Sequence, residues 1–166
     1  RDVANRFNHQ MGDTLVPPKA QIQESTMYVP GTDGEKMSKS KGNIIDIFLA
    51  DKQLRKQIMK IKTDSTPMED PKNPDTCNLF ALYKLVASPA QIEEMRANYL
   101  GGNYGYGHAK QAFYELLIET FKTEREKYHY YMNHLEEVDQ ILNQGAQKAH
   151  LVADEVLKRV RKKLGY

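Results

Sequence analysis

Apolar residues recur at three- and four-residue steps from residue 44 to the end of the chain, and this spacing restricts the fold more than any other feature. Leu54, Ile58 and Ile61 share one face of a predicted helix. Asp51 is the expected N-cap of that helix. Such helices are stable only when they bury their apolar face. We therefore predict a mainly α protein whose body, residues 44–166, is a helical bundle.

The same spacing predicts four further helices in the body. Prolines, serines and glycines mark several of their boundaries, as is usual at helix ends. The last predicted helix has a narrow apolar seam that suits packing against a neighbouring helix. Between the first two helices, Pro67, Pro71 and Pro74 exclude regular structure. The four further helices are expected over residues 75–87, 88–102, 108–135 and 138–160.

The first residues have helical spacing and end at Gly12, a suitable C-terminal stop. The chain thus opens inside what reads as the last turns of a helix, which is an unusual way for a domain to begin. We expect it to be a fragment that lacks a preceding part. An irregular connection follows, and then a short extended run at residues 27–31.

The amino-acid composition of the 166 residues, with 24 basic and 22 acidic side chains, is typical of an ordinary globular protein. A net charge of +2 means that a nucleic-acid partner has to be argued from local clusters. Cys77 is the only cysteine, so the chain forms no internal disulfide. The sequence also lacks the regular spacing of cysteines and histidines that is typical of a metal site. No apolar run approaches the roughly 20 residues that span a bilayer. We expect a cytoplasmic protein without membrane contact.

Residues 36–43, "KMSKSKGN", concentrate three lysines and two serines. Lysine ammonium groups on flexible stems can follow the charge that gathers on a departing pyrophosphate, and hydroxyls and loop N–H groups add donors. Gly42 allows a sharp turn or a close approach of the backbone. The composition alone favours a solvated surface loop, because lysine and serine loops are common on soluble proteins. A specific five-residue string, however, arises by chance on the order of once in 20,000 chains of this length.

The string "KMSKS" resembles the second signature of the class I aminoacyl-tRNA synthetases. Further segments are similar to the bacterial tryptophanyl-tRNA synthetases within that class, and they favour this family over the tyrosine enzymes. The resemblance covers nearly the whole chain and is carried by residues 1–8, 36–43, 61–87, 101–117 and 125–132.

The resemblance implies that residues 1–43 are the C-terminal end of a Rossmann-type catalytic domain with the KMSKS loop. Residues 44–166 would be the α-helical anticodon-binding domain. Lys36 and Lys39 would be catalytic, with Lys39 the main lysine of the transition state, and the strand near Met27 would touch adenine. Many relatives have aspartate where this chain has Lys41. The implied ATP-binding residues are Met27, Lys36, Met37, Ser38, Lys39 and Ser40.

The function implied is that of a tryptophan–tRNA ligase, which activates tryptophan with ATP, accompanied by Mg²⁺, and charges tRNA(Trp). The histidine-containing first signature of the class is absent from the sequence, and the tryptophan pocket belongs to the same absent domain. The chain alone should therefore be inactive. It should also be monomeric, because the family's dimer contact lies mostly in that domain. The full-length enzyme would be a homodimer. The alternative is a stand-alone helical RNA-binding or interaction module.

Two groups in the body are candidates for RNA contact, one basic and one aromatic. A helix end supplies charges and hydrogen-bonding groups, and a glycine-rich loop could offer tyrosine rings to bases. Local packing is the alternative for the tyrosines. The basic residues at 158–163 could bind the phosphates of an RNA backbone. Alternatively, they could be solvated cations that stabilise the negative C-terminal end of a helix dipole. The candidates are Lys60, Lys62, Thr63, Asp64, Tyr104 and Tyr106.

Overall fold

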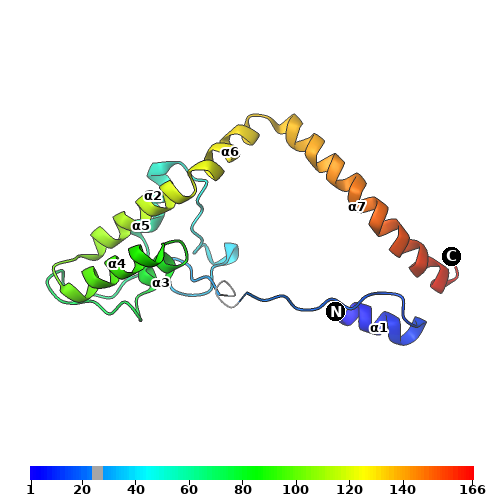
Figure 1. The fold of residues 1–166 in the computed structure, drawn as a ribbon, viewed down its shortest axis with the longest axis horizontal. Coiled ribbons are helices and arrows are strands. Elements are labelled where there is room, and N and C mark those ends of the chain that lie inside the picture. The colour runs from blue at the N-terminus through cyan, green and yellow to red at the C-terminus, as the bar shows by residue number, and fades with distance from the viewer. Residues whose placement is uncertain (24–27) are drawn as a thin grey trace. The chain divides into compact units, whose positions relative to one another are not determined.

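The computed structural model describes residues 1–23 and 28–166 (Figure 1). The chain forms two compact units, one of residues 23–129 and one of residues 1–22 and 130–166. Each unit is described by itself. The units do not follow the predicted division at residues 43 and 44, but that division concerns the function of each part and stays a prediction.

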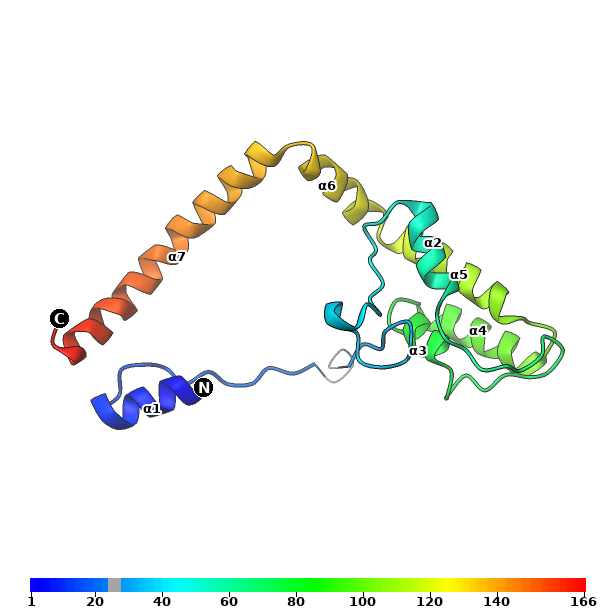
Figure 2. The ribbon, with the colours of Figure 1, turned by 180° about the vertical axis from the view of Figure 1, so that it is seen from behind.

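The unit of residues 23–129 is built on helices, as the apolar spacing predicted. Helix α2 packs along α5 (Figure 2), and α3 also contacts α5. Leu54, Ile58 and Ile61 are at most 1% exposed, so the predicted face is buried. Tyr99 and Phe80 fill the centre of the core with rings 5.4 Å apart. The helices are α2 (Asp51–Met59), α3 (Asn78–Lys84), α4 (Pro89–Gly101), α5 (Tyr106–Thr120) and the start of α6 (Lys122–Met132).

Helix α4 has the boundaries that its sequence predicts. The Ser88 hydroxyl accepts a hydrogen bond from the Gln91 N–H, and the Gln91 side chain accepts one from the Ser88 N–H at 2.9 Å. At the other end Gly102 has a φ of +71°. A Cβ there would lie 2.5 Å from the carbonyl oxygen of Glu69, so both the backbone angle and the space require glycine. Helix α3 is shorter than the predicted helix over residues 75–87 at both ends, because it begins at Asn78 and ends at Lys84.

The prediction of one long helix over residues 108–135 is wrong. Phe121, with φ −101° and ψ 18°, separates α5 from α6, and its half-buried side chain packs against the core. Residues 108–144 contain neither proline nor glycine, so no residue type that usually ends a helix marks this break. After it, the buried Arg125 donates hydrogen bonds to the carbonyls of Ile47 and Leu49. The helix after the break is therefore fixed to the segment that precedes α2.

Asp51 has a different place from the one predicted, because it is the first residue of α2 and Ala50 is the N-cap. Its carboxylate accepts a hydrogen bond from Arg125. An acidic side chain in the first turn is still favourable, because it faces the positive end of the helix dipole.

The other unit contains α1 (Asp2–Met11) and α7 (Leu135–Leu164). Helix α1 ends at Gly12, as predicted, and the Asn8 side chain bonds the backbone of Thr14 and Leu15 beyond it. Helix α7 has 30 residues, none of which is buried. Of its predicted apolar seam, Val138, Val156 and Val160 are half-buried and the other residues are exposed. No helix among the described residues is long and apolar enough to cross a membrane.

Candidate functional site

The KMSKS loop, residues 36–43, leaves the body through a tight hairpin. Pro30 and Lys36 form an isolated antiparallel bridge. The N–H of Gly31 donates to the carbonyl of Glu35 at 2.7 Å, and the N–H of Met37 donates to that of Val29 at 2.9 Å. These bonds fix where the loop begins. Met27, the predicted adenine contact, lies outside the described residues.

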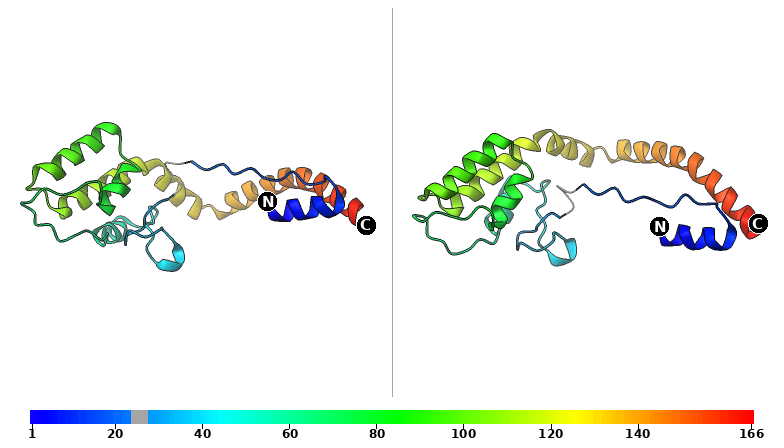
Figure 3. Two further views of the ribbon diagram at one scale, coloured as in Figure 1. Left: turned by 90° about the horizontal axis from the view of Figure 1, so that it is seen from below. Right: turned by 60° about the horizontal axis from the view of Figure 1, so that its bottom comes forward.

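The tip of the loop is a single 3₁₀ turn, η1 (Lys39–Lys41), which lies clear of the helices (Figure 3). The Ser38 and Ser40 hydroxyls are 2.9 Å apart and share a hydrogen bond. Gly42 ends the turn with a φ of +65°, the left-handed conformation that glycine adopts most easily. The predicted sharp turn at this glycine is confirmed, and it reverses the chain so that both ends of the loop meet.

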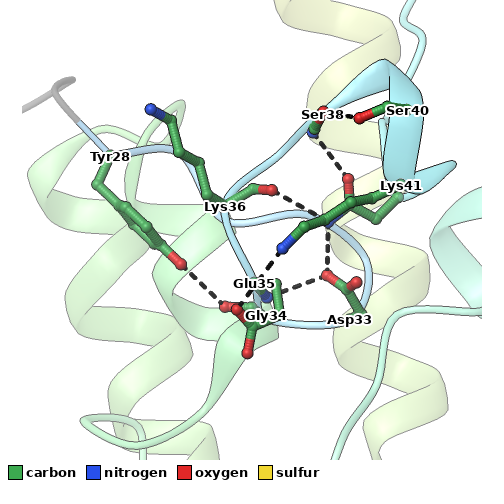
Figure 4. A network of polar contacts seen from close by, with 9 residues as sticks. Tyr28, Asp33, Gly34, Glu35, Lys36, Ser38, Ser40 and Lys41 are labelled. Atoms are coloured by element: carbon green, nitrogen blue, oxygen red, sulfur yellow. Dashed lines mark hydrogen bonds and ion pairs between the residues drawn. The ribbon is translucent and has the colours of Figure 1, made fainter.

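The three lysines of the loop are exposed to solvent. Lys41 reaches back toward Glu35, with the ammonium nitrogen 3.9 Å from a carboxylate oxygen (Figure 4). Lys36 and Lys39 form no ion pair with any residue that the structure describes. The ammonium group of Lys39 and the hydroxyl of Ser40 thus lie on the exposed turn, and the exposed Lys36 lies at the bridge where the loop begins. Two exposed lysines that no described acidic residue neutralises suit a loop that binds a polyanion such as a polyphosphate.

The base of the hairpin is attached to the helical body of its own unit. The N–H of Lys62 donates to the carbonyl of Thr32 at 2.7 Å, and the side-chain amide of Asn78 donates to the carbonyl of Gly31 at 3.0 Å. A pocket of about 290 Å³ lies at this junction. It is lined by Asp33, Lys62, Thr63, Asp64, Thr76, Cys77 and Asn78. Three of the predicted RNA-contact residues therefore lie beside the base of the loop.

The two tyrosines predicted to offer their rings to bases are half-buried. The Tyr104 ring lies 6.1 Å from that of Tyr99, and Tyr106 meets the same ring edge-on at 6.1 Å. The Tyr106 hydroxyl donates to Asp64 at 2.8 Å, so the structure brings these two candidate residues together. Burial raises the pKa of both Tyr104 and Tyr106. Their role in RNA binding stays a prediction, and Lys60 is exposed at the C-cap of α2.

Lys72 is a structural residue that the sequence analysis missed. It is only 2% exposed, although lysine is almost never buried. Its ammonium group donates to the carbonyls of Pro67 at 2.9 Å, Asp70 at 3.0 Å and Met68 at 3.3 Å. The same group lies 5.4 Å from the centre of the Tyr106 ring. One buried cation thus organises the proline-rich loop between α2 and α3.

Asp64 gives this part of the molecule a testable pH dependence. Hydrogen bonds from Thr66 and Tyr106 stabilise its carboxylate and lower its pKa from the ordinary value of 3.8. A lowered folded-state pKa adds stability above pH 3.8, which is lost as the pH falls through that lowered pKa. We expect the gap in melting temperature between wild type and Asp64→Asn to be constant from pH 7 to 5. The gap should shrink below pH 3.8, and circular dichroism melts that show a constant gap would contradict this.

The His, Cys, Asp and Glu side chains of the described residues include no group of three or more that could hold a metal ion. Cys77 is buried, and its sulfur lies 3.7 Å from the Tyr99 hydroxyl. Cys77 is therefore a small residue of the hydrophobic core.

Comparison with known proteins places the loop and helices in a family. Residues 1–122 match the model of the family "tRNA synthetases class I (W and Y)". The chain is 47% identical over 165 residues to the tryptophan–tRNA ligase of Rhodopirellula baltica and 41% identical over 166 residues to that of Fusobacterium nucleatum. Each alignment covers 99% of this chain, and 52% and 51% of the respective relative. The chain therefore spans about half the length of these relatives.

A solved structure gives the same result for the fold. The tryptophanyl-tRNA synthetase of Campylobacter jejuni, crystallised with ADP and tryptophan, matches with a TM-score of 0.86 at 41% identity. The match covers 100% of this chain and 52% of that one. The predicted mainly α fold and the predicted resemblance to bacterial tryptophanyl-tRNA synthetases are confirmed. The chain belongs to the class I tRNA synthetase family that comprises the tryptophan and tyrosine enzymes.

Proposed function

We propose that this chain is the C-terminal part of a tryptophan–tRNA ligase and supplies the loop that binds the triphosphate of ATP. The exposed loop carries the proposal, because no residue that the structure describes neutralises Lys36 or Lys39. The ADP and tryptophan complex of the Campylobacter jejuni enzyme, which shares this fold at 41% identity, supports the choice of nucleotide and amino acid. The second proposed role is recognition of tRNA(Trp) by the helical body, residues 44–166.

In the proposed reaction a carboxylate oxygen of tryptophan attacks the α-phosphorus of ATP. The bond from that phosphorus to the bridging oxygen breaks, and pyrophosphate leaves with the bonding electrons. Negative charge on the β- and γ-phosphates rises as this bond breaks. The exposed ammonium group of Lys39 would follow that charge, while Lys36 would hold the phosphates from the start of the loop. We expect Mg²⁺ to enter bound to ATP.

The tryptophan pocket and the first signature would lie in a part of the ligase that precedes this chain. The chain should therefore need that part for activity. We place the whole ligase in the cytoplasm and expect it to be a homodimer.

The experiment is aminoacylation of a tRNA(Trp) transcript with labelled tryptophan, by the chain alone and by a protein extended to the length of its relatives. Charging by the extended protein only would support the proposal. No charging by a well-folded extended protein, together with tRNA binding by the chain, would favour a stand-alone RNA-binding module.

We expect the chain alone to be a monomer, because the proposed dimer contact lies mostly outside it. Light scattering should give a mass near 19.1 kDa. A mass of twice that value would show that the chain itself carries a dimer contact.

A further inference from the structure

Asn43, which follows the signature, is the most tightly held residue of the basic loop. It is only 3% exposed, whereas the lysines and Ser40 around it face solvent. Its amide oxygen accepts a hydrogen bond from the N–H of Ser38 at 2.8 Å. Its amide nitrogen donates to the Asp33 carboxylate at 2.7 Å and to the Lys36 carbonyl at 3.2 Å. One side chain thus joins the hairpin turn, the start of the loop and its middle.

The backbone around Asn43 is closed as well. Its carbonyl accepts a hydrogen bond from the N–H of Thr32 at 2.9 Å, so the end of the loop is tied to the hairpin. Gly31 lies against it so closely that a Cβ there would be 2.4 Å from the Asn43 amide. The hydrogen bond from Asn43 also lowers the pKa of Asp33, which keeps the accepting carboxylate charged. Asn43 is therefore enclosed by groups that match an amide and leave little room for other side chains.

These bonds divide the loop into a fixed part and a free part. The backbone of Lys36 and Ser38 is held by the Asn43 side chain, while Lys39 to Lys41 form the exposed turn. Asn43 binds the carbonyl of Lys36, three residues before Lys39, and the N–H of Ser38, the residue directly before Lys39. A shift of these groups would move the Lys39 ammonium relative to any phosphate bound at the loop.

We infer that Asn43 is a positioning residue that, by holding the backbone of Lys36 and Ser38, positions Lys36 and the turn that carries Lys39 for the triphosphate. The inference rests on the proposed function of the loop. Asn43 acts through the backbone of Lys36 and Ser38 and needs no contact with the nucleotide. The loop requires an amide here, because the position must accept from one N–H and donate to a carboxylate and a carbonyl at once.

The test uses Asn43→Asp, which has nearly the same size but places a carboxylate against Asp33 and the Lys36 carbonyl. Asn43→Ser is a second variant, since its hydroxyl retains one donor and avoids the added charge. Asn143→Ala, at an exposed position of α7, is the control. Trypsin cleavage after Lys36, Lys39 and Lys41 is measured in the 166-residue chain, with mass spectrometry to identify the sites. Tryptophan-dependent exchange of pyrophosphate into ATP is measured in the extended ligase.

We expect both Asn43 variants to be cleaved in the loop faster than wild type, by about 10-fold for Asn43→Asp. In the extended ligase, kcat for exchange should fall about 10- to 100-fold, as expected for misplaced reacting groups. The KM for tryptophan should stay unchanged at a temperature where circular dichroism shows all variants folded. The control should match wild type in each measurement.

The outcomes separate this inference from the proposed function. An active wild-type ligase whose two Asn43 variants keep wild-type kcat would overturn the inference. A parallel loss of kcat and of tryptophan affinity would also overturn it, because general destabilisation would then explain the result. An inactive wild-type ligase would refute the proposed function instead. In that case unchanged cleavage of the variants would refute the role of Asn43 in holding the loop.

Discussion

Replacing Lys39 with alanine in the proposed ligase is expected to lower the rate of tryptophan activation about 10²- to 10³-fold, the usual loss when one group that stabilises transition-state charge is removed. ATP affinity should fall much less. Lys39 lies on the exposed turn η1 and is not neutralised by any described residue. Its contact with the leaving pyrophosphate would strengthen as charge develops there, and interactions that strengthen in the transition state act on kcat.

Lys41→Ala is the matched control for this prediction. Lys41 is on the same turn, but its ammonium group lies 3.9 Å from the Glu35 carboxylate. We expect a change of only a few-fold in kcat for this variant, since the Glu35 carboxylate already offsets the charge of Lys41. Single-turnover kinetics would separate ATP binding from the chemical step. Equal losses in rate and ATP affinity for Lys39→Ala would mean that Lys39 binds the ground state and the transition state alike.

Replacing Lys72 with methionine is expected to destabilise the unit of residues 23–129 by about 2–4 kcal/mol. Methionine can fill much of the space, but it leaves the carbonyls of Pro67, Met68 and Asp70 without their shared donor. A buried polar group without a partner costs about 1–3 kcal/mol. Some of these carbonyls would regain water, because the loop around them is exposed. Urea denaturation followed by circular dichroism would measure the change.

Lys110→Met is the control for the Lys72 prediction. Lys110 is half-buried and donates to a single carbonyl, that of Met59 at 3.2 Å. Burial lowers the pKa of Lys110, so the loss of its charge should cost less than the loss of a fully bonded cation. We expect a change of about 1 kcal/mol or less. A Lys72→Met variant as stable as this control would show that the three carbonyls do not depend on Lys72.

Much of the helical body could be predicted from the sequence because periodic apolar residues and end signals act locally. The burial of Leu54, Ile58 and Ile61 follows from their spacing, and the start of α4 follows from Ser88 as N-cap and Pro89 as the first helical residue. The break at Phe121 could not be predicted in this way. It carries no proline or glycine signal, and it depends on how the Phe121 ring packs against the core of its unit.

The candidate site was predictable in part for the same physical reason. The lysines and serines of the loop were identified from a contiguous string and from the glycine that closes it. Asn43 and Lys72 act through partners that neither composition nor periodicity indicates. Asn43 binds a carboxylate ten residues away, and Lys72 is satisfied by backbone carbonyls, which every sequence contains. From sequence alone, a lysine among prolines is expected to be exposed, and only the structure shows that Lys72 is buried.

Tryptophan-dependent exchange of labelled pyrophosphate into ATP tests the central claim most directly, since it reports the step at which the loop would act. It should be measured for the 166-residue chain and for the protein extended to the length of its relatives, with tyrosine as the competing amino acid. We predict exchange by the extended protein with tryptophan, little with tyrosine, and none by the chain alone. A well-folded extended protein that exchanges with neither amino acid would contradict the assignment of this chain to a tryptophan–tRNA ligase.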